Sequence, residues 1–237
     1  MDINYIGHST VELVDDDTRI LIDPFLKPNN PAADLTADDV NPTHVLMTHA
    51  HADHAADAVA VGKRTGASFV AISEFANVLE EQGIEGVADP NLGGTVEFDW
   101  GWVKLVQAFH TSTFPGSADR PFSPTPGTVI GAPSGLVVNF AGKTLYHLGD
   151  TCLFSDLKLI AERTPVDIAF IPIGGHYTMD RHDAVVAADF IGAETVIPIH
   201  YNTFPPIETD AEAFKSDVES KTKSKVAVLA PGESLSV

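Results

Sequence analysis

Apolar and polar positions alternate along the chain in a way that divides it into two similar halves. Each half opens with short apolar runs separated by turn residues, a pattern that predicts antiparallel strands. The runs that predict these strands lie at residues 3–6, 10–14, 19–23, 95–98, 102–108, 135–140 and 143–148. Each half is therefore expected to begin with a strand meander.

Strand–helix alternation is predicted to follow each meander. In the first half the expected elements are the strand 45–47, the helix 55–60, the strand 68–72 and the helix 74–81. In the second half they are the helices 155–163, 181–191 and 210–220 and the strands 167–172, 194–199 and 225–229. The pattern predicts an α/β fold, an αββα sandwich of two mixed β-sheets with helices on the outer faces. We expect residues 1–237 to form one domain, since no stretch has the composition of a linker.

Two details refine this prediction. Thr209 and Glu212 have the spacing of a capping box, which predicts where the last helix begins. Residues 27–42 and 112–127 are rich in proline and polar residues, so both are expected to be long loops. A loop as long as 112–127 is often a lid or part of a substrate site.

The stretch from Thr48 to His54 is the strongest candidate for chemistry. It holds four side chains that can bind metal ions, separated only by alanines: His49, His51, Asp53 and His54. In an extended turn, the first two of these can bind one ion and the last two a second ion beside it. Imidazole and carboxylate groups suit Zn²⁺, Mn²⁺, Fe and Ni, so the spacing predicts a metal site.

Three further candidates each follow a predicted strand. His110, Asp150 and His200 stand where apolar runs end, as the stretch from Thr48 to His54 does. Strand ends at one edge of a sheet converge on a crevice, so we expect these side chains to lie close together.

The motif Thr-His-x-His-x-Asp-His after a strand resembles the signature of the metallo-β-lactamase superfamily. The resemblance implies that His49, His51 and His110 bind a first metal ion. It implies that Asp53, His54 and His200 bind a second ion and that Asp150 bridges the two. The expected cofactors are two divalent metal ions, zinc first, with manganese, nickel or iron as alternatives.

Other motifs resemble one branch of this superfamily, the metal-dependent hydrolases related to the ascorbate-6-phosphate lactonases. These motifs include Gly7-His8-Ser9, Leu21-Ile22-Asp23-Pro24-Phe25, Gly149-Asp150-Thr151 and Pro198-Ile199-His200-Tyr201. The resemblance implies hydrolysis by a hydroxide that two metal ions activate. A lactone or other ester is the first substrate class, and a small phosphodiester is the second.

Two alternatives come from other functional classes. A diiron oxidoreductase on the same fold usually has glutamate at the position of His51. A non-catalytic metal-binding protein would have lost one of the seven ligands, and all seven positions are filled here.

Five residues have weaker assignments. Asp53, His8 and His176 are the expected catalytic residues: Asp53 transfers a proton, and the two histidines contact substrate or an oxyanion. A turn or surface role is the alternative for both histidines. Asp23 is expected to orient a ligand histidine. Cys152, the only cysteine, is expected to be a small buried core residue.

Charge and hydropathy limit the partners. The chain carries 33 acidic and 14 basic residues, a net charge of -19, which repels phosphate backbones and predicts no nucleic-acid partner. No apolar run approaches the roughly 18 residues of a membrane span, so no membrane partner is expected. Met1-Asp2-Ile3-Asn4 lacks the features of a signal peptide, and a cytoplasmic location is expected. A small-molecule substrate is the expected partner, and assembly as a homo-oligomer stays open.

Overall fold

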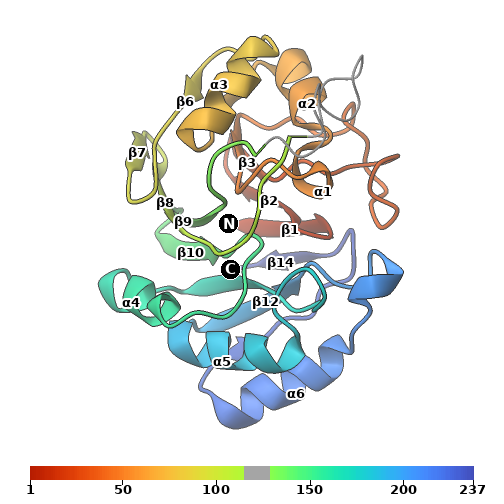
Figure 1. Ribbon diagram of the computed structural model, residues 1–237, viewed down its shortest axis with the longest axis vertical. Coiled ribbons are helices and arrows are strands. Elements are labelled where there is room, and N and C mark those ends of the chain that lie inside the picture. The colour runs from red at the N-terminus through yellow and green to blue at the C-terminus, as the bar shows by residue number, and fades with distance from the viewer. Residues whose placement is uncertain (115–128) are drawn as a thin grey trace.

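Two seven-stranded β-sheets face each other in the computed structural model, which describes residues 1–114 and 129–237 (Figure 1). The first sheet contains, in spatial order, β14 (Ser234–Ser236), β1 (Asp2–Gly7), β2 (Thr10–Asp15), β3 (Thr18–Ile22), β4 (His44–Leu46), β5 (Ser68–Val70) and β6 (Val87–Ala88). The second contains β13 (Lys225–Val226), β12 (Thr195–Ile199), β11 (Ile168–Pro172), β10 (Lys143–His147), β9 (Ser134–Phe140), β8 (Gly101–Gln107) and β7 (Thr95–Phe98).

Helices cover the outer face of each sheet, so the predicted αββα sandwich is confirmed. The first sheet carries α1 (Ala52–Ala55), α2 (Ala58–Thr65) and α3 (Ser73–Glu81). The second carries α4 (Asp156–Arg163), α5 (Arg181–Ile191) and α6 (Ala211–Lys221), and a short 3₁₀ helix, η1 (Pro205–Ile207), precedes α6. None of the described helices is both long and apolar enough to cross a membrane.

Alternating side chains divide the core into two layers, as the period of a strand requires. On β11, Ile168 and Phe170 pack with residues of the first sheet, whereas Ala169 and Ile171 pack under the helices of the second sheet. β11 is therefore apolar on both faces, which explains its continuous apolar run.

Strand direction places the candidate ligands at one edge of each sheet. Each sheet combines an antiparallel meander with a parallel part, as predicted. Consequently β1, β3 and β4 run in one direction within the first sheet, and β8, β10 and β12 do so within the second. The turns that follow these six strands carry all the candidate metal ligands.

The prediction for residues 49–60 was wrong in two respects. Residues 52–55 form the single helical turn α1 rather than an extended turn. The predicted helix 55–60 is interrupted, and α2 begins only at Ala58. Asp57 lies at the break, where its carboxylate accepts hydrogen bonds from the Leu26 amide (2.6 Å) and the Asn29 side chain (2.9 Å). These partners lie in another part of the chain, so the sequence around the helix does not reveal them.

Of three other predicted elements, two differ from the structure and one lies mostly outside the described residues. The capping box was wrong: Asp210, rather than Thr209, caps α6, because its carboxylate accepts from the Ala213 amide at 2.9 Å. The predicted strand 225–229 is reduced to β13, and the short strands β6 and β14 were not predicted. Most of the predicted loop 112–127 lies outside the described residues, as does any role for it as a lid.

Candidate metal centre

Eight side chains form two adjacent groups at the edge where the strands end. His49, His51, His110 and Asp150 make the first group; His8, Asp53, His54 and His200 make the second. Within each group, the atoms that could bind a metal ion all lie within 4.8 Å of one another. The structure thus brings together all seven predicted ligands and pairs His49 with His51 and Asp53 with His54 as expected. It adds His8, which was predicted as a pocket residue.

Asp150 lies between the two groups. Its Oδ1 is 3.2 Å from His54 Nε2, and its Oδ2 is 3.1 Å from His200 Nε2. The same Oδ2 is 3.5 Å from His110 Nε2 and 4.0 Å from His49 Nε2. One carboxylate therefore faces members of both groups, which is the geometry expected of a bridging ligand.

Unpartnered buried atoms show that the site fits metal ions. Five atoms of the two groups are buried and have no aligned hydrogen-bond partner among the described residues: His49 Nε2, His54 Nε2, Asp150 Oδ1, and both His200 Nδ1 and Nε2. Buried polar atoms without partners are costly, by about 1–3 kcal/mol each, and are rare unless a ligand satisfies them. The donor set of imidazole nitrogens and carboxylate oxygens suits divalent transition metals.

Asp23 orients the ligand residue His54, as predicted. Its Oδ2 lies 2.7 Å from His54 Nδ1 and accepts a 2.6 Å hydrogen bond from the Thr48 hydroxyl, while Oδ1 accepts from the Thr48 amide at 2.8 Å. The Thr48 hydroxyl oxygen in turn lies 3.0 Å from His49 Nδ1. These contacts direct the Nε2 lone pairs of both histidines toward the centre. The contribution of Thr48 was not predicted.

Left-handed backbone occurs at three positions around the centre. His8 has φ 59°, Asp23 φ 49° and His200 φ 54°. Non-glycine residues rarely adopt this conformation, which costs on the order of 1–3 kcal/mol, and it is concentrated at functional sites. Gly149, beside Asp150, has φ 61°, and a Cβ there would lie 2.8 Å from the Ser134 carbonyl oxygen. A sharp turn therefore presents Asp150 to the ligand groups.

The electrostatics of the site favour a cation. Burial alone would raise the pKa of Asp150, but His200 and His54 lower it well below its usual range. Burial lowers the pKa of His49 well below its usual value, and burial with nearby His110 lowers that of His51 to about 4. Burial would also lower the pKa of His200, but Asp150 raises it to about 9. The carboxylates are therefore charged and His49 and His51 are neutral, as metal ligands require, whereas His200 and His54, whose pKa Asp150 also raises, hold protons that a bound cation would displace.

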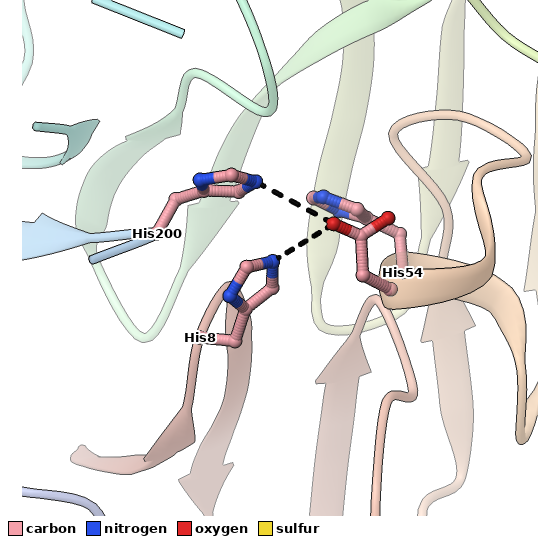
Figure 2. Close-up of side chains that lie close together, drawn as sticks. His8, His54 and His200 are labelled. Atoms are coloured by element: carbon pink, nitrogen blue, oxygen red, sulfur yellow. Dashed lines mark hydrogen bonds and ion pairs between the residues drawn. The ribbon is translucent and has the colours of Figure 1, made fainter. Parts of the chain in front are cut away.

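His8 occupies the edge of the second group. Figure 2 shows the rings of His8, His54 and His200 close together, with His8 and His200 both directed at one carboxylate oxygen. This oxygen is Asp53 Oδ2, which lies 3.2 Å from His8 Nε2 and 3.7 Å from His200 Nε2. Burial, followed by the proximity of His200, lowers the pKa of His8 to about 4. His8 is only 1% exposed, so it is poorly placed for direct contact with a substrate.

His176 and Cys152 differ from the ligand residues. His176 is exposed on the turn before α5, where its ring contacts Tyr177, and it belongs to neither group. The turn is close in space to Asp150, since the Met179 amide donates to the Thr151 carbonyl at 3.1 Å. A substrate contact by His176 stays a prediction. Cys152 is exposed, so its expected place in the core was wrong.

Comparisons with known proteins agree with this architecture. The family described as the β-lactamase superfamily domain matches residues 2–200. A UPF0173 metal-dependent hydrolase of Shouchella clausii is 47% identical over 220 residues, which cover 93% of this chain and 94% of that protein. The chain belongs to the UPF0173 metal-dependent hydrolase family. The predicted resemblance to the metallo-β-lactamase superfamily is thereby confirmed.

Other members and neighbours of the UPF0173 family extend the match over the whole chain. A UPF0173 metal-dependent hydrolase of Thermus thermophilus is 46% identical over 235 residues, 99% of this chain and 98% of that protein. The solved structure of Igni18, a metallo hydrolase from Ignicoccus hospitalis, is 37% identical, with a TM-score of 0.85. It covers 99% of this chain and 97% of that chain. The UPF0173 family assignment therefore includes every strand end that carries a candidate ligand.

Proposed function

We propose that this protein hydrolyses a lactone or other ester of small-molecule size, with two divalent metal ions held by the two ligand groups. The observation that carries the proposal is Asp150, whose two oxygens face nitrogen atoms of both groups at 3.1–4.0 Å. A carboxylate placed in this way can be shared by two cations, one in each ligand group. Membership of a metal-dependent hydrolase family supports the reaction class.

Each ligand group would bind one metal ion. His49, His51 and His110 would hold the first ion, and Asp53, His54 and His200 the second, with Asp150 shared between them. Zinc is the first choice for this donor set, and manganese, nickel and iron are alternatives. When bound, such ions acidify water and polarise the carbonyl or phosphoryl oxygen of a substrate.

Asp53 is the residue that we assign to proton transfer. Its side chain is 30% exposed, whereas that of Asp150 is 2% exposed, so of the two carboxylates Asp53 is the one that solvent and substrate can reach. Burial would raise its pKa, but the contacts with His200 and His8 lower it, so Asp53 is an ionised acceptor at neutral pH. It takes the proton of the attacking water as the new C–O bond forms. It then gives this proton to the leaving oxygen as the ester bond breaks.

The net charge and the shared carboxylate both bear on the class of substrate. A net charge of -19 disfavours nucleic acid and other polyanions, which supports a small-molecule substrate. A small phosphodiester is the second candidate, because a two-ion site with a shared carboxylate also suits in-line attack at phosphorus. We assign a supporting contact with substrate to His176, on the turn tied to Thr151.

Metal analysis combined with a substrate panel tests the proposal. Protein purified without chelator or affinity tag should contain two ions per chain by elemental analysis. It should hydrolyse at least one lactone or aryl ester faster than any phosphodiester, and His49→Ala should abolish this activity. His176→Ala should keep its metal and lower kcat/KM.

Two results would contradict the proposal. A protein that holds two ions but hydrolyses only phosphodiesters would replace the first substrate class by the second. A protein that binds one ion or none after incubation with zinc, manganese, nickel and iron would refute the two-ion centre itself.

A further inference from the structure

His8 differs from the other buried histidines of the metal centre in the hydrogen bonds of its ring. His49, His54 and His200 each present a buried ring nitrogen that lacks a hydrogen-bond partner among the described residues. His8 presents none, because Nδ1 lies 2.9 Å from the Thr203 hydroxyl and Nε2 lies 3.2 Å from Asp53 Oδ2. A ring whose two nitrogens are both satisfied by protein atoms needs no metal ion to complete it.

The partners of the ring fix which nitrogen carries the proton. His8 Nε2 lies 3.2 Å from a carboxylate oxygen, Asp53 Oδ2, which is the natural acceptor for a ring N–H, so His8 Nε2–H donates to it. Nδ1 is then the acceptor and receives the Thr203 hydroxyl proton at 2.9 Å, in preference to the longer 3.3 Å contact between that hydroxyl and the Tyr201 carbonyl. The result is a directed chain of hydrogen bonds from Thr203 through His8 to Asp53.

The backbone of His8 makes a second link, to His200. The His200 amide donates to the His8 carbonyl at 2.8 Å, and the Tyr5 hydroxyl donates to the same oxygen at 3.0 Å. The two imidazole rings lie 4.0 Å apart between centroids. Because His8 follows β1 of the first sheet and His200 follows β12 of the second, this contact joins the two sheets at the metal centre.

We infer that His8 is a positioning residue of the second ligand group, whose ring orients the Asp53 carboxylate and whose carbonyl fixes the turn that carries His200. The inference rests on the proposed two-ion function and adds a residue that the seven-ligand set does not include. It also reassigns His8, which was predicted to contact substrate. Outer contacts of this kind typically change metal affinity by about 10–100-fold.

Two substitutions of His8 separate its hydrogen bond to Asp53 from its other contacts. His8→Gln retains a long side chain with an N–H that can reach Asp53. His8→Asn tolerates the left-handed backbone at φ 59° but is too short to reach Asp53. Both keep the carbonyl that binds the His200 amide.

A second pair of variants, Thr203→Val and Thr203→Ser, removes or keeps the hydroxyl at the other end of the hydrogen-bond chain. Thr203 is only partly buried and lines a cavity of about 610 Å³ beside His8, so both variants should fold.

The measurement is stepwise titration of the metal-free protein with Co²⁺, followed by visible absorption and by competition with a chelator. For His8→Asn we expect the ion of the second ligand group to bind about 10–100-fold more weakly and with an altered absorption band, while the ion of the first group binds as in the wild type. His8→Gln and Thr203→Ser should restore most of the affinity, and Thr203→Val should lose less than His8→Asn. His182→Ala, at an exposed histidine outside both groups, is the control.

Three results would overturn the inference. Unchanged affinity for both equivalents in His8→Asn would show that its ring does not position Asp53. Equal losses in His8→Asn and His8→Gln, with a spectrum of lower coordination number, would make His8 a metal ligand. Equal weakening of both equivalents would indicate a general structural role. If the wild type bound only one Co²⁺, the two-ion function would fail. The role of His8 would still be tested, by whether His8→Asn lowers the affinity for that ion more than His8→Gln does.

Discussion

The two ligand groups share Asp150 but differ in burial. In the first group His49 and Asp150 are buried, whereas His51 and His110 are partly exposed. In the second group all three histidines are buried and only Asp53 is partly exposed. The histidines of the first group are therefore more open to solvent than those of the second, whose one accessible side chain is Asp53.

The groups also differ in their supporting contacts. The second group is held by Asp23 on His54, by His8 on Asp53 and by the His8 carbonyl on the His200 amide. The first group has Thr48 beside His49 and a long 3.4 Å contact between Thr111 and His51. Rigid support lowers the entropic cost of binding, so we expect the second position to be preorganised and the first to be adaptable.

The largest effect is expected from removing the residue that the groups share. Asp150→Ala deletes the carboxylate that faces both groups, so both ions should bind at least about 100-fold more weakly, and activity should be lost. Elemental analysis after dialysis checks this expectation. Full occupancy of both positions in the variant would show that the groups are independent and that Asp150 bridges nothing.

A smaller and unequal effect is expected at Asp23. Asp23→Asn keeps a residue that tolerates the left-handed backbone but leaves a buried donor without its acceptor, at a cost of about 1–3 kcal/mol in stability. Because Asp23 contacts His54 directly and His49 only through Thr48, the second ion should lose more affinity than the first. Stepwise Co²⁺ titration and chemical unfolding measure the two quantities.

Asp57→Asn is the matched control for Asp23. Asp57 is also a buried aspartate that accepts two hydrogen bonds, yet it belongs to neither ligand group. It should lose stability without loss of metal affinity. Equal losses of the two ions in Asp23→Asn would remove the asymmetry between the groups.

Metal removal tests the difference in burial itself. A chelator should extract the two ions in two kinetic phases, the faster from the first group, because His51 and His110 are open to solvent. A coloured chelator followed by absorbance resolves the phases, and His54→Ala should eliminate the slower one. Loss of both ions in a single phase would indicate that the two positions empty together.

The smallest expected effect is that of salt, which should leave the difference between the two ligand groups unchanged. Screening of the net charge of -19, over a Debye length near 10 Å at about 0.1 M salt, should raise the melting temperature between low and moderate salt. The ratio of the two ion affinities should stay constant, since both groups lie within the same acidic protein. A flat melting temperature, or a ratio that changes with salt, would show that the surface charge acts differently.

The sequence allowed much of this to be predicted because the local signals were strong. Apolar runs of the right length identified most strands. Four potential ligands within one short stretch identified the candidate metal site without information from the rest of the chain. The convergence of strand ends predicted that His110, Asp150 and His200 lie close together, but their division between the two ligand groups needed the resemblance to a known family. Position along the chain does not reveal which strand ends are neighbours.

Other features could not be predicted, because they depend on residues that are distant in the chain. Thr203 lies 195 positions from His8, and their contact exists only once the two sheets have packed. The break before α2 depends on Leu26 and Asn29, which bind the Asp57 carboxylate. Cys152 looked like a core residue, yet it lies outside the apolar layers because the turn after β10 faces the solvent there.

The left-handed backbone around the second group has an evolutionary consequence. His8 and His200 belong to that group and Asp23 supports it, and all three have positive φ; His49, His51, His110 and Asp150 do not. A replacement at His200 must satisfy both coordination chemistry and a conformation that few residues tolerate, whereas a replacement at His51 must satisfy only the first. Drift toward a different metal, such as the exchange of His51 for glutamate that would suit iron, is therefore less constrained by the backbone at His51 than it is at His200.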